Sequence, residues 1–340
     1  MRARLLIAVA VLAGAAGTAS LGTAAPSGTF TFVGGGDIAL VGAGATRATF
    51  AGVRRFLHGD LVMGNLEGTL ASGGSAKCSS YGVNGCFTFR AAPDSAHALR
   101  AAGFNVLNVA NNHALDYGPQ AHAQTLAALR AAGIDYDGLP GQITYVQAGE
   151  AKVAIIGAAP YPWAQSLLKI AATQRLVRRA RLHVDVVIVY MHAGAEGVSA
   201  DHVTGKPEVF LGEQRGNPRA FAHAMINAGA SVVFASGPHV LRGIEFFHGH
   251  PIAYSLGNLA GNNTLSTGGT LALSALLKLK LGVDGTFVSG SVIPLRLDTV
   301  GTPSYDSTGA SLTLIGTLSR EDFGANAARL SRTGALSAPS

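Results

Sequence analysis

The chain has 340 residues, of which 48% are hydrophobic and only 13% are charged, and its formal net charge is +6. This composition is too apolar for a disordered protein and is sufficient for one large α/β domain or two smaller ones. The 45 glycines follow no three-residue period, which excludes a collagen-like chain.

The N-terminus has the pattern of a secretory signal peptide. Arg2 and Arg4 precede an apolar segment at residues 5–16, and small residues follow it. Because this segment is short for a membrane span, we favour cleavage near residues 19–25 over an uncleaved anchor. We therefore expect a secreted or cell-surface protein from which residues 1–25 are removed.

Between residues 29 and 235 the predicted elements alternate between strands and helices. Short apolar runs predict buried strands, and amphipathic runs followed by glycine predict helices. Strands are expected at residues 29–33, 61–64, 105–110, 152–158, 184–191 and 231–235, and helices at 93–102, 120–132, 164–182 and 221–228.

After residue 243 the predicted elements are strands. They span residues 243–247, 251–255, 270–281 and 286–294, with His248-Gly249 as a hairpin turn between the first two. An α/β body followed by a strand-rich part indicates one domain over residues 26–318 with a second sheet. Residues 319–340 are polar and rich in Ala and Ser, and we expect a flexible tail.

Two cysteines, Cys78 and Cys86, flank a loop rich in Gly and Ser. In an exported protein this arrangement predicts a disulfide. Metal ligation is the alternative, but two thiols without nearby partners make a poor metal site.

Positive charge is concentrated on the predicted helix at 164–182. Arg175, Arg178 and Arg179 recur at helical spacing, with Arg181 close by. This pattern indicates one solvated helix face, with a patch for an anionic polymer as the alternative. Nucleic-acid binding is not expected, because no aromatic stacking platform accompanies the charge.

Polar residues of metal-ligand type follow five of the predicted strands. Open α/β sheets bind ligands just beyond the carboxyl ends of their strands, so these residues are expected to meet. Carboxylate, imidazole and amide ligands suit Zn, Mn or Fe, and one or two such ions could activate a water at a phosphoester. The residues are Asp37; Asn65 and Glu67; Asn112 and His113; His192 and Glu196; and His239.

Each of these residues also has a simpler explanation. Asp37 could cap a loop, Asn65 could be a turn residue, and His113 could be a hydrogen-bonded core histidine. Such residues at five successive strand ends nevertheless favour one shared site.

The same residues lie in strings that resemble the CapA family of poly-γ-glutamate capsule proteins. The most specific strings contain N-L-E and N-N-H-x-x-D-Y-G, and the resemblance covers residues 30 to about 262 in order. The strings are GD at 36–37, GNLEG at 64–68, ANNHALDYG at 110–118, VYMHAGAE at 189–196, GPHVL at 237–241 and YSLGNL at 254–259.

The resemblance implies a fold, a role and partners. CapA-type proteins are similar to calcineurin-like metallophosphatases, which implies a four-layer αββα sandwich with mixed sheets. The implied role is in making or exporting poly-γ-glutamate, an anionic polymer, with capsule-synthesis membrane proteins as possible partners.

The resemblance also implies roles for individual residues. His113 would donate a proton to the leaving group, and Asp116 would orient a histidine through its other ring nitrogen. Metal ligands would be Asp37, Glu67, Asn112, His192 and His239, and substrate contacts would come from Asn65, Glu196 and Asn258.

Two departures from the metallophosphatase pattern concern the metal. Asp37 is not followed by the histidine of a D-x-H motif, and His239 lacks the upstream histidine of a G-H-x-H pair. One divalent ion, or a weakly bound pair, is therefore expected. Three functions stay open: a capsule protein with metal-assisted hydrolysis or transfer, a general secreted phosphoesterase, and a non-catalytic polymer-binding protein.

Overall fold

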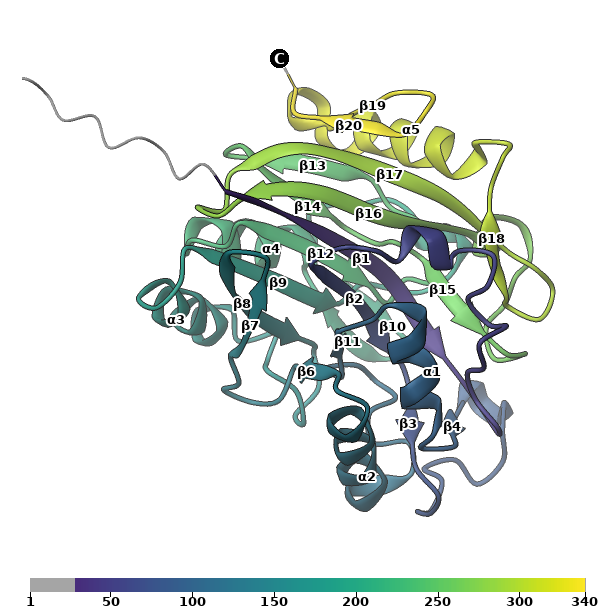
Figure 1. Ribbon diagram of the computed structural model, residues 1–340. Coiled ribbons are helices and arrows are strands. Elements are labelled where there is room, and N and C mark those ends of the chain that lie inside the picture. The colour runs from purple at the N-terminus through teal and green to yellow at the C-terminus, as the bar shows by residue number, and fades with distance from the viewer. Residues whose placement is uncertain (1–27, 340) are drawn as a thin grey trace, which may run out of the picture.

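The computed structural model describes residues 28–339, so the predicted signal peptide lies outside the described residues. Within this range no helix is both long and apolar enough to span a membrane. The chain forms two large sheets that lie face to face, with helices on both outer sides (Figure 1).

The larger sheet has the order β19-β20-β17-β16-β1-β2-β5-β6, with β15 beside β1 and β18 beside β17. Strands β1, β2, β5 and β6 are parallel, whereas β16 and β17 are antiparallel neighbours. The bounds are β1 (Thr29–Ala39), β2 (Leu61–Leu66), β5 (Val106–Asn108), β6 (Asp135–Asp137), β15 (Asn258–Gly261), β16 (Leu273–Gly282), β17 (Phe287–Leu297), β18 (Pro303–Tyr305), β19 (Arg329–Leu330) and β20 (Ala335–Ser337).

The second sheet has the order β13-β14-β12-β9-β8-β7. Its central strands β8, β9, β12 and β14 are parallel, and β13 returns antiparallel to β14 through the predicted turn at His248-Gly249. The bounds are β7 (Thr144–Ala148), β8 (Ala151–Ala158), β9 (Val186–His192), β12 (Val232–Ser236), β13 (Ile244–Phe247) and β14 (His250–Ala253).

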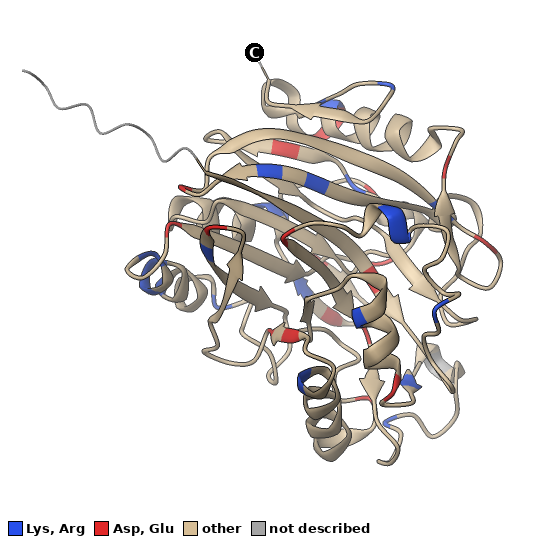
Figure 2. Cartoon of the chain, viewed as in Figure 1, with Lys and Arg blue, Asp and Glu red and all other residues tan. Residues whose placement is uncertain are grey.

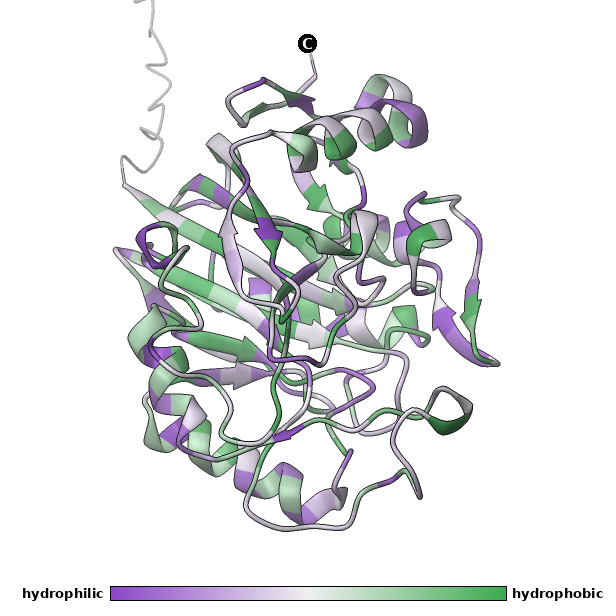
Figure 3. Cartoon of the chain, turned by 90° about the vertical axis from the view of Figure 1, so that its right-hand side faces the viewer, coloured by the Kyte–Doolittle hydropathy of each residue, from purple (hydrophilic) through white to green (hydrophobic). Residues whose placement is uncertain are grey.

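Three apolar clusters define the four layers. Between the sheets, Phe32 and Met63 meet Ile188 and Phe234. Helices α1 (Ser95–Ala102) and α2 (Gly118–Ala131) cover the outer face of the larger sheet, and α3 (Ile170–Arg181) and α4 (Pro218–Asn227) cover that of the second. The predicted αββα sandwich is therefore confirmed, and hydrophobic residues line its strands in Figure 3.

Helix α3 begins six residues later than predicted. The backbone groups of Gln165 and Leu167 bond instead to Gly138 and Ala159, which holds this segment in an extended path. The arginines of α3 are exposed on the side opposite Leu176 and Val177, and they colour this helix blue in Figure 2. The solvated helix face is thus confirmed.

The C-terminal residues differ from the flexible tail that we expected. Helix α5 (Ala310–Phe323) packs on β17 and β13, so it closes one edge of both sheets. Strand β20 then pairs with β17, and Leu336 is buried against the core between the sheets. Strands β19 and β20 are too short to give a sequence pattern that predicts them, and they are held by the pairing of β20 with β17 and with β19.

Candidate metal centre

The parallel strands of both sheets end at the same place. Asp37 on β1 is paired with Asn65 on β2 and with Asn258 on β15. In the other sheet, Ser236 on β12 is paired with His192 on β9. The site therefore lies where the carboxyl ends of the two sheets meet, as expected for an open α/β sheet.

Asp37 joins the two sheets. Its Oδ1 accepts a hydrogen bond from the Ser236 hydroxyl, and its Oδ2 accepts one from the backbone N–H of Gly237 at 3.1 Å. Close approach of β1 and β15 requires a glycine before it, because a Cβ at Gly36 would lie 1.8 Å from the carbonyl oxygen of Gly257. This explains locally why GD ends the first strand.

Three of the five predicted ligands gather in one cluster. Asp37, Glu67 and His239 each offer a ligand atom, and these atoms all lie within 4.8 Å of one another. His239 Nδ1 is 3.3 Å from Asp37 Oδ2, and its Nε2 is 3.8 Å from Glu67 Oε1. Two carboxylates and an imidazole suit a divalent transition-metal ion.

His239 is held in place by its neighbours. Its backbone φ is 60°, in the left-handed region that residues other than glycine rarely adopt. Its Nδ1 is 2.8 Å from Asn258 Oδ1, so the ring donates there and presents Nε2 to Glu67 and to Glu196. Asn258 therefore orients a candidate ligand, which is the role expected of a residue behind a metal site.

Glu67 provides the test of whether the site fits a metal. It is fully buried, and within residues 28–339 neither of its carboxylate oxygens has a hydrogen-bond partner. Burial, followed by the charge of Asp37, raises the pKa of Glu67 well above its usual range. A cation bound between Glu67, Asp37 and His239 would satisfy these oxygens, so the residues fit a divalent ion.

The other members of the cluster have opposite shifts. Burial raises the pKa of Asp37, but hydrogen bonds and charge from His239 outweigh it and lower the pKa to about 2. Burial lowers the pKa of His239, and the charges of Glu67 and other carboxylates outweigh it and raise the pKa to about 10. Without an ion, a proton on His239 therefore takes the place of the cation.

His192, a fourth predicted ligand, borders the cluster without joining it. His192 Nδ1 is 3.3 Å from the Asn65 amide nitrogen, and its Nε2 is 3.7 Å from Glu67 Oε1. If Nδ1 accepts from Asn65, Nε2 carries the proton and cannot bind a metal, so His192 is a ligand only in the other tautomer. Asn112 Oδ1 is buried and has no partner among the described residues.

Asn65 has a different role from the predicted substrate contact. It is fully buried, and its Nδ2 donates to Asp37 Oδ1 at 2.7 Å. Its Oδ1 accepts from Asn108 Nδ2 at 2.6 Å and from Asn111 Nδ2 at 3.0 Å. Asn65 therefore positions Asp37, and the expectation of direct substrate contact is wrong for this conformation.

His113 and Asp116 form the predicted pair. His113 Nδ1 lies 2.8 Å from Asp116 Oδ2, and Asp116 Oδ1 pairs with Lys77 at 2.7 Å. Burial lowers the pKa of His113, opposed by Asp116, so the ring is neutral near pH 7. In that form His113 accepts a proton through Nε2 before it can donate one.

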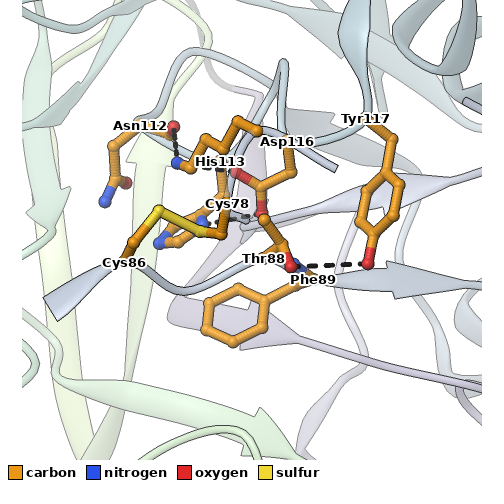
Figure 4. The surroundings of a disulfide bond; sticks show 9 residues. Cys78, Cys86, Thr88, Phe89, Asn112, His113, Asp116 and Tyr117 are labelled. Atoms are coloured by element: carbon orange, nitrogen blue, oxygen red, sulfur yellow. Dashed lines mark hydrogen bonds and ion pairs between the residues drawn. A yellow bond between two sulfur atoms is a disulfide. The ribbon is translucent and has the colours of Figure 1, made fainter. Parts of the chain in front are cut away.

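The predicted disulfide is present beside this pair. Cys78 and Cys86 are bonded, and Figure 4 draws His113 and Asp116 among the residues that surround the disulfide. Lys77, the residue before Cys78, also donates to the carbonyl oxygen of Asn112. The disulfide loop thus fixes the lysine that holds Asp116.

A cleft of about 320 Å³ opens above the cluster. Its polar lining residues include His113, His239, Glu196 and Asn258, so Glu196 and Asn258 lie where substrate contacts were expected. Its apolar wall includes Phe87, Phe89 and Phe210, and the ring centroids of Phe89 and His113 are 4.4 Å apart.

Sequence reasoning missed several residues of the site. Asn111 stood inside one of the quoted strings and Ser236 directly before another, but polar neighbours of a ligand carry no distinct spacing. Arg215 lies on a short hairpin, β10 (Glu208–Phe210) and β11 (Glu213–Gly216), that contains no motif. It is 1% exposed and its Nη1 lies 2.9 Å from Glu196 Oε1.

The fold and the site together define an αββα protein with a buried carboxylate–histidine cluster suited to one divalent ion. Residues 31–263 match the bacterial capsule synthesis protein PGA_cap family, and the chain belongs to that family. The resemblance to the CapA family inferred from the strand-end strings is thereby confirmed.

Similar proteins include two capsule proteins of known name. The chain is 27% identical over 220 residues to the PGA biosynthesis protein CapA of Bacillus subtilis, covering 60% of this chain and 53% of that protein. It is 29% identical over 216 residues to the capsule biosynthesis protein CapA of Bacillus anthracis, covering 60% of this chain and 50% of that protein. The chain thus spans about half the length of these curated relatives.

Among solved structures, a putative 5′-nucleotidase from Staphylococcus aureus overlaps with 86% of this chain and 58% of that chain. The sequence identity is 14% and the TM-score is 0.45.

Proposed function

We propose that this protein is an exported CapA-type protein of poly-γ-glutamate capsule metabolism whose cleft binds one divalent ion and an anionic substrate. The observation that carries the proposal is Glu67: it is a buried carboxylate beside Asp37 and His239, and its two oxygens have no hydrogen-bond partner among the residues that the structure describes. Export is supported by the N-terminal sequence pattern, and the polymer by the names of the two relatives.

The residues in and around the cleft would together catalyse hydrolysis or group transfer at a phosphoester or γ-amide. A bound ion would supply Lewis-acid activation of a water or of the scissile group. Asn65 and Asn258 hold Asp37 and His239 in position through hydrogen bonds of 2.7 and 2.8 Å. His113, oriented by Asp116, would take a proton at Nε2 and return it to the leaving group.

The direct test is metal content. Purified mature protein loaded with Mn²⁺, Zn²⁺ or Fe²⁺ is expected to retain about one ion per chain, and Glu67→Gln to retain none. Glu321→Gln, on the exposed face of α5, is the control and should bind metal normally. Absence of bound metal after every loading would contradict the proposal.

Substrate assays then separate the candidate functions. A γ-glutamyl oligomer and a simple phosphodiester are each incubated with the loaded and the chelated protein. Cleavage of the first supports capsule metabolism, and cleavage of the phosphodiester alone favours a general phosphoesterase. Binding of the oligomer without cleavage, unaffected by chelation or by His113→Ala, would favour a polymer-binding protein. The supporting observation for that function is that the D-x-H and G-H-x-H histidines are missing at Asp37 and His239.

A further inference from the structure

Arg215 is a buried cation whose guanidinium is only partly paired. Its Nη1 lies 2.9 Å from Glu196 Oε1 and 3.8 Å from Glu213 Oε2. Its Nε and Nη2 have no hydrogen-bond partner within the described part of the chain. These two nitrogens form one edge of the planar group, the edge that binds a carboxylate or phosphate through two parallel hydrogen bonds.

A second buried arginine shows what a purely structural role looks like. Arg242 is also 1% exposed, yet its Nε donates to Ala200 O at 2.7 Å. Its two Nη atoms donate to the two carboxylate oxygens of Glu208 at 3.0 and 2.7 Å. Since buried N–H groups without partners are costly, the empty edge of Arg215 calls for a ligand, whereas Arg242 is complete.

Arg215 lies beside the candidate metal cluster. Its partner Glu196 lines the cleft and is 3.6 Å from His239 Nε2. Its Cζ is 6.0 Å from the ring centroids of Tyr161 and Phe210, and Phe210 also lines the cleft. Arg215 thus lies behind the wall that Glu196 and Phe210 form, and a positive charge there would hold the anionic group of a substrate whose reacting bond is at the cluster.

We propose that the Nε–Nη2 edge of Arg215 recognises an oxyanion of the substrate, a carboxylate or a phosphate. This rests on the proposed function and adds the residue that selects the substrate class. Arg215 belongs to β11 of the β10–β11 hairpin, which pairs with no other described strand. Because its Nε and Nη2 are buried, this segment must move for the ligand to reach them. The tip residue of the hairpin, Leu211, is 68% exposed, and a Cβ at Gly85 of the disulfide loop would lie 3.1 Å from Leu211 Cδ1.

The test is anion binding by calorimetry to the full mature protein, both metal-loaded and chelated. Inorganic phosphate and a γ-glutamyl trimer are the two probes, and they distinguish a phosphate from a carboxylate ligand. The variants are Arg215→Lys and Arg215→Gln, and Arg242→Lys is the control with equal burial. We expect both Arg215 variants to lose about tenfold or more in affinity for one probe, because lysine cannot supply two parallel donors.

The outcomes separate this inference from the proposed function. Wild-type affinity in Arg215→Lys, with unchanged melting temperature, would overturn the inference even if metal binds as expected. No binding of either anion by the wild type would also overturn it. A loss confined to the Arg215 variants, with normal metal content and normal anion binding in Arg242→Lys, supports it, and Arg215→Lys decides the matter if Arg215→Gln does not fold.

Discussion

Glu67 and Glu245 are both fully buried glutamates, and they differ in what surrounds them. Glu67 has no hydrogen-bond partner within residues 28–339, and its pKa is raised well above the usual range, first by burial. Burial also raises the pKa of Glu245, but hydrogen bonds from His223 and Tyr254 outweigh it and lower the pKa. The partners of Glu245 are His223 at 2.8 Å, Tyr254 at 2.7 Å, Arg219 at 3.4 Å and Asn326 at 3.4 Å.

The difference distinguishes a structural carboxylate from a functional one. Burial of a charge is costly unless it is paired, so a satisfied buried glutamate contributes to folding. An unsatisfied one weakens the fold in the absence of a ligand, and it persists where a ligand makes use of it. Glu245 on β13 binds His223 and Arg219 of α4, whereas Glu67 follows the end of β2 and lies beside the ligand atoms of Asp37 and His239.

Asp137 extends this comparison, because it is unpartnered but lies behind the site. It is fully buried, neither carboxylate oxygen has a partner among the described residues, and burial raises its pKa to about 7. A Cβ at Gly157 would lie 2.0 Å from Asp137 Oδ1 and 2.2 Å from Asn108 Oδ1, so the two oxygens face the same point. A proton on Asp137 allows it to donate to Asn108, which in turn holds Asn65.

The largest effect is therefore expected for Asp137→Asn. The pKa of Asp137 is about 7 in the folded state, above its value of 3.8 in the unfolded chain. The free energy of unfolding of the wild type is therefore highest below about pH 4, falls between about pH 4 and 7, and is constant above about pH 7. An asparagine keeps a donor toward Asn108 without this loss, and should be more stable by roughly 4 kcal/mol above pH 7. Urea denaturation at pH 4 and pH 8 measures the difference, and equal stability of variant and wild type at pH 8 would contradict the prediction.

The next effect is expected for Glu245→Gln. Removal of this charge leaves His223 and Arg219 without their carboxylate, and should cost about 3 kcal/mol of unfolding free energy near pH 7. Metal content should be unchanged, because Glu245 is not part of the cluster. Glu321→Gln is the exposed control, and a change below about 1 kcal/mol for Glu245→Gln would mean that the pairing is not structural.

Glu67→Gln should behave in the opposite way. A glutamine removes the unpartnered charge, so the metal-free protein should be at least as stable as the wild type at pH 8. Metal affinity should fall by more than about 100-fold, since even residues behind a ligand commonly contribute 10- to 100-fold. Titration with Mn²⁺ or Zn²⁺ measures this, and destabilisation of the metal-free variant by several kcal/mol would remove the contrast with Glu245.

Much of the fold could be predicted because its pattern is local. Buried β-branched runs predicted β8, β9 and β12 closely, and His248-Gly249 gave the turn between β13 and β14. The hairpin β10–β11, helix α5 and the last two strands were missed. Strands β10, β11, β19 and β20 are only two to four residues long, which is too short for a clear alternation of apolar and polar residues. The end of the tail is held by contact of β20 with β17.

The site was predictable in its members but not in their roles. Strand ends and strings placed Asp37, Glu67 and His239 together, since side chains that follow parallel strands must meet. Whether an amide faces the substrate or a neighbour depends on geometry across two sheets, so Asn65 was assigned to the wrong partner. Arg215 had no sequence signal. It stands out because its Nε and Nη2 have no hydrogen-bond partner among the described residues, and only the folded structure shows this.

The smallest effect is expected for the disulfide. It holds the loop that carries Lys77, and Lys77 pairs with Asp116 behind His113. Cys78→Ser with Cys86→Ser should cost about 2.5 kcal/mol, because the bond closes only a short loop. Lys77 would then leave Asp116 more readily, and loss of its charge should raise the pKa of His113, which Lys77 helps to lower. Denaturation with and without reductant measures the first effect, and an NMR titration of His113 measures the second. The double variant itself should not respond to reductant. An unchanged melting temperature of the wild type after full reduction would show that tertiary contacts alone hold the loop.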